Sequence, residues 1–304
     1  MKTHEIKRIL IPLDFSETSL LALEQGAYMA RLFDAELYLL HVIEMIEFAY
    51  SIYDPSVAVP VDTEAIERNV EKIITGHAER IEKQYGLHIR TLIRIGRVAT
   101  EVRDATEENE VDLVVMGTHG AKGFGEFFIG SNAHKTVTIS SCPVLTVREH
   151  STKQGFADIV MPIDNTLHSR QKVNLVIQLA KLYGARVHML GLINKGEEDS
   201  RNKFMIKIEA VEKVLQHAGV TFTQKITEGE NLAEETMKYA KEVNGDLIVI
   251  MTDHESKFTG MFLGAFAKQI INHSHIPVLS VRPLEGHYET VDLSASSNPF
   301  NSDI

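Results

Sequence analysis

The chain has 304 residues, a formal net charge of −11 and one cysteine, Cys142. Its hydrophobic fraction of 44% and charged fraction of 24% are typical of a water-soluble globular protein, and its length allows two domains of ordinary size. The negative charge argues against general binding to nucleic acids or membrane surfaces. A single cysteine excludes an internal disulfide, and the N-terminal segment lacks the apolar core of a signal peptide, so we expect a cytoplasmic protein.

Strands and helices are predicted to alternate along the first half of the chain. Apolar runs predict strands at Arg8–Leu13, Glu36–Val42, His88–Arg94, Leu113–Met116 and Val144–Val147. Helical spacing and capping residues predict helices from Ser16 or Thr18 to about Phe33, over Asp62–Tyr85, over Val98–Glu108 and from Asn132 to Ser140. Such alternation favours a parallel sheet with helices on both faces.

The chain contains one sequence pattern twice. Residues 111–148 align without gaps with residues 245–282 at an offset of 134, and 14 of the 38 positions are identical. Ile9–Asp14 aligns with Ile159–Asp164 at an offset of 150. A repeat of this length indicates two homologous domains in tandem.

We place the first domain at 1–150 and the second at 151–285. The first copy has about 16 extra residues, 150 minus 134, which fit best at Glu44–Asp62, where we expect a loop or flap. The tail 286–304 is polar and rich in Ser and Asn, so we expect it to be disordered. The strands of the second domain are predicted near 159–163, 186–192, 221–226, 247–251 and 278–281.

The stretch from Val111 to Ser131 combines a buried strand, a glycine-rich loop and a helix start. Glycines let backbone N–H groups close on an anion, and a helix N-terminus adds partial positive charge, so this combination predicts a phosphate site. The stretch is not a Walker A loop, because it lacks Gly-Lys-Ser/Thr, and it is not a Rossmann fingerprint. A flexible surface loop that needs glycine for its turns is the alternative.

Ligands of doubly wound sheets bind beyond the carboxyl ends of the strands, where the strand order reverses. If the order is 3-2-1-4-5, Asp14 after the first strand and Gly117 after the fourth face one crevice. Asp14 would then bind a ribose or an adenine, or else serve as a helix cap or turn residue. His119 would bind a phosphate or hold the turn, and Val42 and Met116 would pack on an adenine ring or belong to the core.

These residues resemble a known family. The spacing Gly117-x2-Gly120-x9-Gly130-Ser131 is similar to the G-x2-G-x9-G-S/T motif of ATP-binding universal stress proteins. The opening ILIPLDFSETSLLALEQGAYMA, the segment LLHVIE and the closing CPVLTV also resemble that family. The resemblance covers nearly all of both copies, so the chain looks like a tandem universal stress protein.

The resemblance implies two Rossmann-like (HUP) α/β domains, each a doubly wound five-stranded parallel sheet of order 3-2-1-4-5. It also implies a bound ATP, or AMP or ADP, with Mg or Mn on the phosphates. Base and ribose contacts then fall on Pro12, Asp14, Val42 and Met116. Phosphate contacts fall on Gly117, His119, Gly120, Gly130, Ser131 and Asn132.

Family dimers commonly pair their fifth strands. Within this chain the fifth strands Val144–Val147 and Val278–Val281 would pair with each other and form a pseudo-dimer. The whole chain would then be a monomer or form a homodimer. The second copy departs from the motif, since Met251, His254 and Ala265 replace the two glycines and the serine. We therefore expect one nucleotide site per chain, in the first copy.

We expect a nucleotide-binding stress-response regulator with an unknown protein partner and without fast catalysis. No P-loop lysine, arginine finger or water-orienting residue can be assigned in the sequence, so we name no catalytic residue. We also name no metal site, because His273 and His275 do not share a helical face. The alternatives are a slow ATPase or adenylyl-transferring enzyme, and an interaction module that binds no nucleotide.

Overall fold

The computed structural model describes residues 6–44, 62–118, 129–149, 154–166, 168–196, 201–252 and 263–283. The chain divides between Gly155 and Phe156 into two compact units, which we call domain 1 and domain 2. Most of the expected flap, 45–61, and the tail 286–304 lie outside the described residues.

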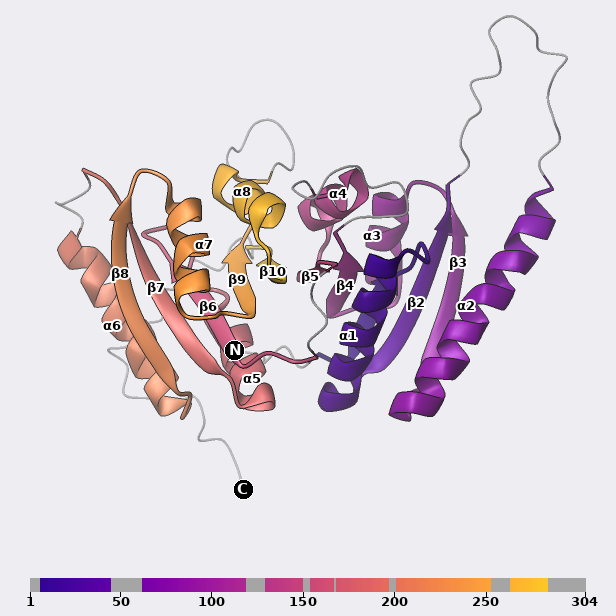
Figure 1. The fold of residues 1–304 in the computed structure, drawn as a ribbon, viewed down its shortest axis with the longest axis horizontal. Coiled ribbons are helices and arrows are strands. Elements are labelled where there is room, and N and C mark those ends of the chain that lie inside the picture. Colours follow the sequence, from indigo (N-terminus) through magenta and orange to yellow (C-terminus); the bar gives the residue numbers. More distant parts are fainter. Residues whose placement is uncertain are drawn as a thin grey trace, which may run out of the picture. The chain divides into compact units, whose positions relative to one another are not determined.

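Domain 1 alternates strands and helices, as its sequence predicts (Figure 1). Its elements are β1 (Arg8–Pro12), α1 (Glu17–Phe33), β2 (Glu36–Ile43), α2 (Thr63–Tyr85), β3 (Ile89–Ile95), α3 (Val98–Glu108), β4 (Leu113–Gly117), α4 (Ser131–Ile139) and β5 (Val144–Val147). All neighbouring strands are parallel, in the order β3-β2-β1-β4-β5. The expected strand order 3-2-1-4-5 is confirmed.

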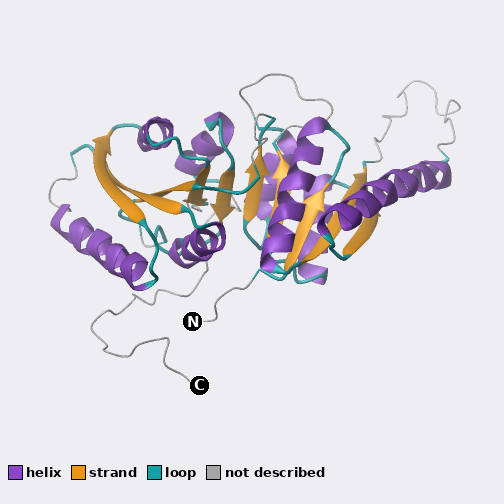
Figure 2. Cartoon of the chain, turned by 60° about the horizontal axis from the view of Figure 1, so that its bottom comes forward, coloured by secondary structure: helices purple, strands orange, loops and turns teal. Residues whose placement is uncertain are grey.

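Helices cover both faces of the domain 1 sheet. Contacts place α1 and α2 together on one face and α3 beside α4 on the other, and Figure 2 shows strands lying between helices. Because both faces are covered, the central strands carry continuous apolar runs. Ile9, Leu10 and Ile11 of β1 are all 0% exposed, as is Leu39 of β2.

Domain 2 repeats the fold. Its elements are β6 (Asp158–Ile163), α5 (Val173–Tyr183), β7 (Arg186–Asn194), α6 (Arg201–His217), β8 (Phe222–Gly229), α7 (Leu232–Glu242), β9 (Leu247–Met251), α8 (Ala265–His273) and β10 (Val278–Val281). Its parallel strands have the order β8-β7-β6-β9-β10, again 3-2-1-4-5. The pairing of the two fifth strands, β5 with β10, stays a prediction.

One carboxylate fixes the entry of the first strand in each domain. Asp112 accepts hydrogen bonds from the backbone N–H groups of Lys7 (2.8 Å) and Arg8 (2.9 Å). Asp246, its counterpart in the repeat, does the same for Asp158, the first residue of β6, and for Ala157 before it. The two aspartates therefore set the position of the strand whose far end leads to Asp14 or Asp164.

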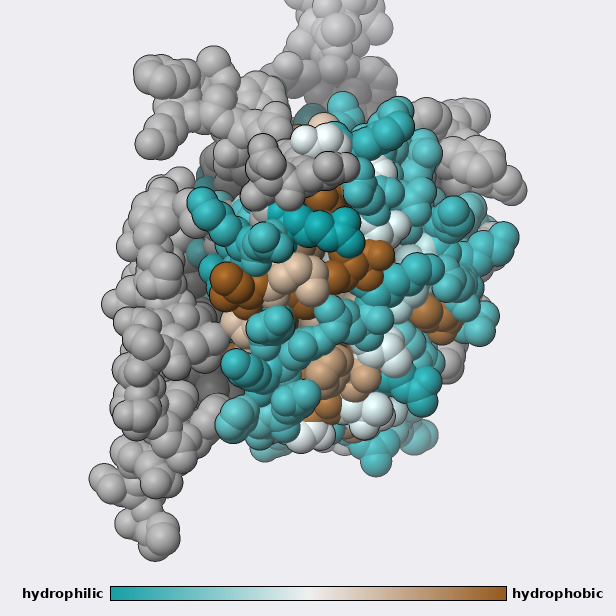
Figure 3. Space-filling model, turned by 90° about the vertical axis from the view of Figure 1, so that its left-hand side faces the viewer, coloured by the Kyte–Doolittle hydropathy of each residue, from teal (hydrophilic) through white to brown (hydrophobic). Residues whose placement is uncertain are grey.

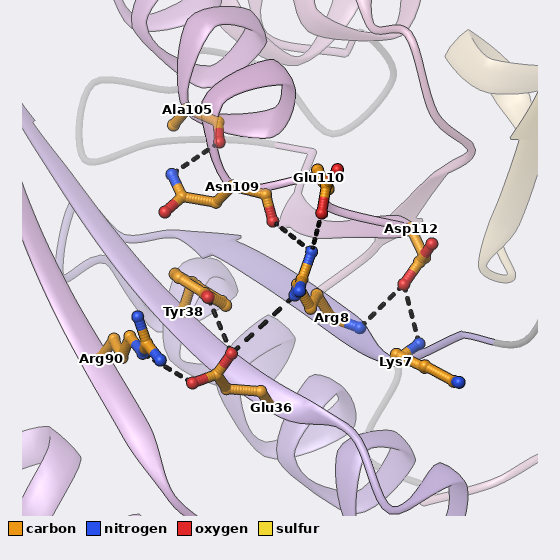
Figure 4. Close-up of polar contacts among 9 residues, drawn as sticks. All are labelled: Lys7, Arg8, Glu36, Tyr38, Arg90, Ala105, Asn109, Glu110 and Asp112. Carbon is orange, nitrogen blue, oxygen red and sulfur yellow. Dashed lines mark hydrogen bonds and ion pairs between the residues drawn. The ribbon is translucent and has the colours of Figure 1, made fainter.

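A polar cluster surrounds Arg8 at the same edge of domain 1 (Figure 4). Its guanidinium donates to Glu110 (2.7 Å), and Glu36 accepts from the hydroxyl of Tyr38 (2.7 Å) and pairs with Arg90 (2.6 Å). The hydrogen bond from Tyr38 is the main cause that lowers the pKa of Glu36, and Arg90 adds to it. This cluster joins β1, β2 and β3 at the edge opposite the predicted site.

Strand β8 forms the outer edge of the domain 2 sheet. Its centre carries the exposed polar residues Thr223, Gln224 and Lys225, and Lys225 pairs with Glu242 of α7. Figure 3 shows this side of the molecule as mainly hydrophilic, with small apolar areas between the polar side chains. Polar and charged residues on an edge strand disfavour pairing with another sheet.

Candidate functional site

The strand order of domain 1 reverses between β1 and β4. These strands pair through Ile9 with Leu113 and Leu10 with Val114, so their carboxyl ends lie at one edge of the sheet. Pro12 ends β1, and Met116 and Gly117 end β4. This is the edge at which doubly wound sheets bind ligands.

The glycine-rich loop is closed at its base. The backbone N–H of Gly130 donates to the carbonyl of Thr118 at 2.6 Å, and the N–H of Thr118 donates to the carbonyl of Val147 at 3.0 Å. The two ends of the predicted phosphate loop therefore meet beside the end of β4. His119 and Gly120, both predicted to contact phosphate, lie outside the described residues.

Helix α4 begins directly after this contact, with Gly130 as its N-cap residue. Among the described residues no side chain caps its first turn, and the turn contains no acidic residue. Ser131 is exposed and Asn132 is partly exposed. A helix start of this kind offers backbone N–H donors and partial positive charge to an anion.

Asp14 lies in the turn that joins β1 to α1. Its Oδ1 accepts hydrogen bonds from the backbone N–H (3.1 Å) and the hydroxyl (2.5 Å) of Ser16. Ser16 in turn caps α1 by accepting from the N–H of Ser19, so Ser16 and not Thr18 is the cap. Asp14 is exposed and holds the turn, which leaves its carboxylate at the sheet edge.

Phe15 has a left-handed backbone with φ of 63°. Its ring stacks on His41 of β2, with centroids 4.7 Å apart, and on His77 of α2 at 5.9 Å. The Nδ1 of His41 lies 2.7 Å from the carbonyl of Leu13, so this nitrogen is the donor. Burial is the main cause that lowers the pKa of His77, with Arg80 adding to it.

This stack fixes the backbone on both sides of Asp14. A left-handed backbone is unusual for a bulky residue and persists where the surroundings impose it. Phe15, His41 and His77 were not predicted as parts of the site, because nothing in a single sequence signals a positive φ at a phenylalanine. The remaining predicted base contacts differ in exposure: Pro12 and Met116 are buried, and Val42 is partly exposed.

A profile of the universal stress protein family matches residues 5–148 and, a second time, residues 155–282. The chain belongs to the universal stress protein family. Its two domains are thus two copies of the family's fold in tandem, as the repeat in the sequence predicts.

Relatives with one and with two such domains are known. A universal stress protein of Mycolicibacterium smegmatis is 26% identical over 302 residues, which cover 90% of this chain and 97% of the relative. A universal stress protein of Methanocaldococcus jannaschii is 29% identical over 149 residues, 47% of this chain and 82% of the relative. The crystal structure of a universal stress protein from Archaeoglobus fulgidus covers 93% of this chain with a TM-score of 0.73 at 18% identity, and 98% of that structure is covered.

The second universal stress protein domain has a different site. Met251 stands where domain 1 has Gly117, and α5 begins only at Val173, although the counterpart of Glu17 is position 167. Residues before Val173 form turns, with the N–H of Gln171 donating to the carbonyl of His168. In domain 1 a Cβ on Gly117 would meet the backbone of Thr18 at 2.9 Å. A methionine at this position would have no room beside a first helical turn placed as in domain 1.

The counterparts of the four predicted base and ribose contacts line a small cavity in domain 2. They are Pro162, Asp164, Leu192 and Ile250, and Met251 and Phe266 also border it. Asp164 holds the same turn as Asp14, because its Oδ1 accepts from the N–H (2.9 Å) and hydroxyl (2.6 Å) of Thr166.

None of the helices in the described part of the chain is long and apolar enough to cross a lipid bilayer. Within the same residues, no three His, Cys, Asp or Glu side chains gather as a metal site would require.

Proposed function

We propose that domain 1 binds an adenine nucleotide, ATP or its AMP or ADP forms, and that nucleotide occupancy regulates a stress response in the cytoplasm. The family membership supports this proposal, together with the intact Gly117-x2-Gly120-x9-Gly130-Ser131 motif in domain 1. Base and ribose would contact Pro12, Asp14, Val42 and Met116. The phosphates would meet Gly117, His119, Gly120, Gly130, Ser131 and Asn132, with Mg or Mn bound to them.

The observation that carries the proposal is the hydrogen bond from Gly130 to Thr118. It joins the two ends of the predicted phosphate loop and links the end of β4 to the start of α4, whose first turn carries no side-chain cap among the described residues. An anion beside the start of α4 would accept hydrogen bonds from backbone N–H groups and interact favourably with the helix dipole. Asp14 follows the neighbouring strand β1 at the same edge, where a ribose hydroxyl would donate to it.

The role we propose is regulatory. The motif segment contains neither a P-loop lysine nor an assignable arginine finger, the groups that speed phosphoryl transfer elsewhere. Nucleotide occupancy would instead set a change of conformation or of binding to a partner protein. Domain 2 would not take part, because Met251 and Phe266 stand where domain 1 has Gly117 and Asn132.

Titration calorimetry of the full chain with Mg-ATP tests the proposal. The variants are Gly130→Trp, which places a bulky side chain at the start of α4, and Gly264→Trp, the matched change at the start of α8. We expect one ATP per chain, lost in Gly130→Trp and retained in Gly264→Trp. Two ATP per chain would overturn the assignment to domain 1 alone, and no binding by protein free of copurified nucleotide would overturn the proposal.

A further inference from the structure

Three polar side chains form a chain of hydrogen bonds at the amino edge of the domain 2 sheet. His188 of β7 lies with its Nε2 2.9 Å from Oδ1 of Asp158, the first residue of β6. Its Nδ1 lies 2.8 Å from the hydroxyl of Thr223 in β8. Strand pairing brings the three together, because His188 stands opposite Val160 and opposite Thr223. Asp158 lies two residues before Val160 and therefore on the same face of the sheet.

The carboxylate of Asp158 determines which nitrogen of His188 carries the proton. A carboxylate only accepts hydrogen bonds, so Nε2 of the neutral imidazole is the donor. Nδ1 then has a free electron pair and accepts the hydrogen bond from the hydroxyl of Thr223. The hydroxyl proton thus points at a base whose other nitrogen is held by a carboxylate. This arrangement of hydroxyl, imidazole and carboxylate is the one that activates a nucleophile.

The exposure of the three side chains differs in the way that such chemistry requires. Thr223 is exposed on strand β8. His188 is only 4% exposed, and its ring makes a perpendicular contact with Tyr239 of α7, with centroids 6.3 Å apart. The side chain of Asp158 is 30% exposed. A reactant can therefore reach the hydroxyl from solvent while packing holds the imidazole in place.

The free edge of β8 provides a backbone donor beside this hydroxyl. In a parallel ladder alternate residues bond to the neighbouring strand, and the N–H of Val187 donates to the carbonyl of Thr221. The N–H of Thr223 therefore faces β7, and the N–H of Gln224 faces away from it. In the described sheet β8 is the last strand. Gln224 can thus donate to the oxyanion that develops when a carbonyl is attacked.

Domain 1 has other residue types at these positions. The counterparts of the aspartate and the histidine at the offset of 150 are Arg8 and Tyr38, and the residue opposite Tyr38 in β3 is Arg90. These side chains belong to the ion-pair cluster of Figure 4. The same fold therefore forms without a histidine at this corner. The exchange gives domain 2 alone a base beside an exposed hydroxyl.

We propose that domain 2 transfers acyl groups of small esters through Thr223. His188 is the general base, and Asp158 is a positioning residue that orients the imidazole. Oγ of Thr223 forms a bond to the ester carbonyl carbon while its proton passes to Nδ1 of His188. The bond to the leaving oxygen then breaks, and that oxygen takes the proton from Nδ1 as the alcohol departs.

Water completes the reaction of the acyl-threonine. It attacks the carbonyl carbon and gives a proton to Nδ1 of His188. The bond to Oγ of Thr223 breaks, Oγ recovers the proton, and a carboxylic acid is released. Ester and water thus become acid and alcohol. This inference does not depend on nucleotide binding by domain 1.

Hydrolysis of para-nitrophenyl acetate by the full chain tests the proposal. Thr223→Val removes the hydroxyl and keeps the shape of the side chain. Thr221→Val makes the same change at an exposed threonine two residues earlier and is the matched control. We expect the control to react at the wild-type rate and Thr223→Val to be slower by about tenfold or more. A positioned base contributes roughly 10²- to 10⁴-fold, and other exposed side chains add a background rate.

A fluorophosphonate probe locates the nucleophile. Its phosphorus forms a stable bond to an activated hydroxyl as fluoride leaves, and mass spectrometry of peptides identifies the labelled residue. We expect the label on Thr223 in wild type and in Thr221→Val. Asp158→Asn should lower kcat with little change in KM, because an amide no longer fixes the tautomer of His188.

Three outcomes would overturn the proposal. They are hydrolysis by wild type no faster than in buffer, equal rates in wild type and Thr223→Val, and probe labelling that leaves Thr223 unmodified. Circular dichroism checks that each variant is folded. Thr223 is exposed on an edge strand, so Thr223→Val carries the test even if Asp158→Asn does not fold.

Discussion

Gly117 lies so close to Thr18 that a Cβ atom on the glycine would stand 2.9 Å from the Thr18 carbonyl carbon. Such a contact is too short for a real side chain, so α1 begins where it does because residue 117 is glycine. Domain 2 has Met251 at this position, and α5 begins at Val173. The glycine that opens the phosphate motif therefore also positions the first helix.

The first prediction tests this packing role. We expect Gly117→Met to lower the free energy of unfolding of domain 1 by about 1–3 kcal/mol, because an added side chain must push the first turn of α1 away. Urea unfolding followed by circular dichroism measures the change. The control is Gly76→Ala in the middle of α2, where a Cβ would meet nothing within 4 Å. It should stabilise the domain by about 0.5–1 kcal/mol, and a Gly117→Met variant as stable as wild type would refute the packing argument.

The second prediction concerns Glu36 and pH. Its folded pKa lies below the ordinary value of 4.5, chiefly through the hydrogen bond from Tyr38. A lowered folded pKa gives stability that is present above the unfolded pKa and is lost as the pH falls through the folded pKa. We expect Glu36→Gln to lower the free energy of unfolding by about 1 kcal/mol at pH 7 and to leave it unchanged near pH 2. Urea unfolding at several pH values across this range measures the difference.

A matched surface carboxylate controls the Glu36 experiment. Glu64 pairs with Arg68 within α2, and the side chain of Glu64 is 83% exposed. An exposed pair of this kind contributes little, so Glu64→Gln should leave stability almost unchanged at both pH values. If Glu36→Gln behaves like Glu64→Gln, the cluster in Figure 4 does not stabilise the sheet edge.

The third prediction concerns the single cysteine. Burial raises the pKa of Cys142 to about 11, and its sulfur lies 3.7 Å from the hydroxyl of Ser140. Thiolates are the reactive form of cysteine. We expect the thiol to resist a disulfide reagent at pH 8 in the folded protein and to react fully in urea. Rapid reaction of the native protein would contradict a structural role for Cys142.

Local patterns and the repeat predicted most of the fold. The strand Val144–Val147 and the helix Val98–Glu108 have the predicted bounds, because each depends on apolar spacing within its own segment. The late start of α5 was not predicted, since the residue at the position of Gly117, Met251, is far along the chain. The strand predicted at 221–226 extends to Gly229 for a similar reason, because β7 provides pairing partners along its whole length.

The candidate site was predicted in outline from its glycines and Asp14. Sequence spacing indicates which residues end neighbouring strands, and it also left open whether Asp14 holds the turn, which it does. It could not indicate that Phe15 has a positive φ or that Lys172 is buried. Both features depend on how distant elements pack around one turn, and a lysine in a sequence favours an exposed position.

The last prediction joins the aromatic stack to the proposed nucleotide site. Phe15→Gly relieves the left-handed backbone, which should raise the free energy of unfolding by about 1 kcal/mol. It also removes the stacking on His41 and His77, which should lower the free energy of unfolding by about as much. We expect nearly unchanged stability. We expect ATP to bind about tenfold more weakly, because the turn that carries Asp14 must then be ordered on binding.

Calorimetry with Mg-ATP measures this effect, and Asn165→Gly, the matched change in the turn of domain 2, provides the control. Asn165→Gly removes a side-chain contact with Lys207, and ATP bound in domain 1 should not respond to it. Weaker binding in Phe15→Gly alone would identify the stack as a positioning device for Asp14. Equal affinities in wild type and Phe15→Gly would mean that the turn needs no such support, and that the strained backbone of Phe15 serves the packing of α2 against β2.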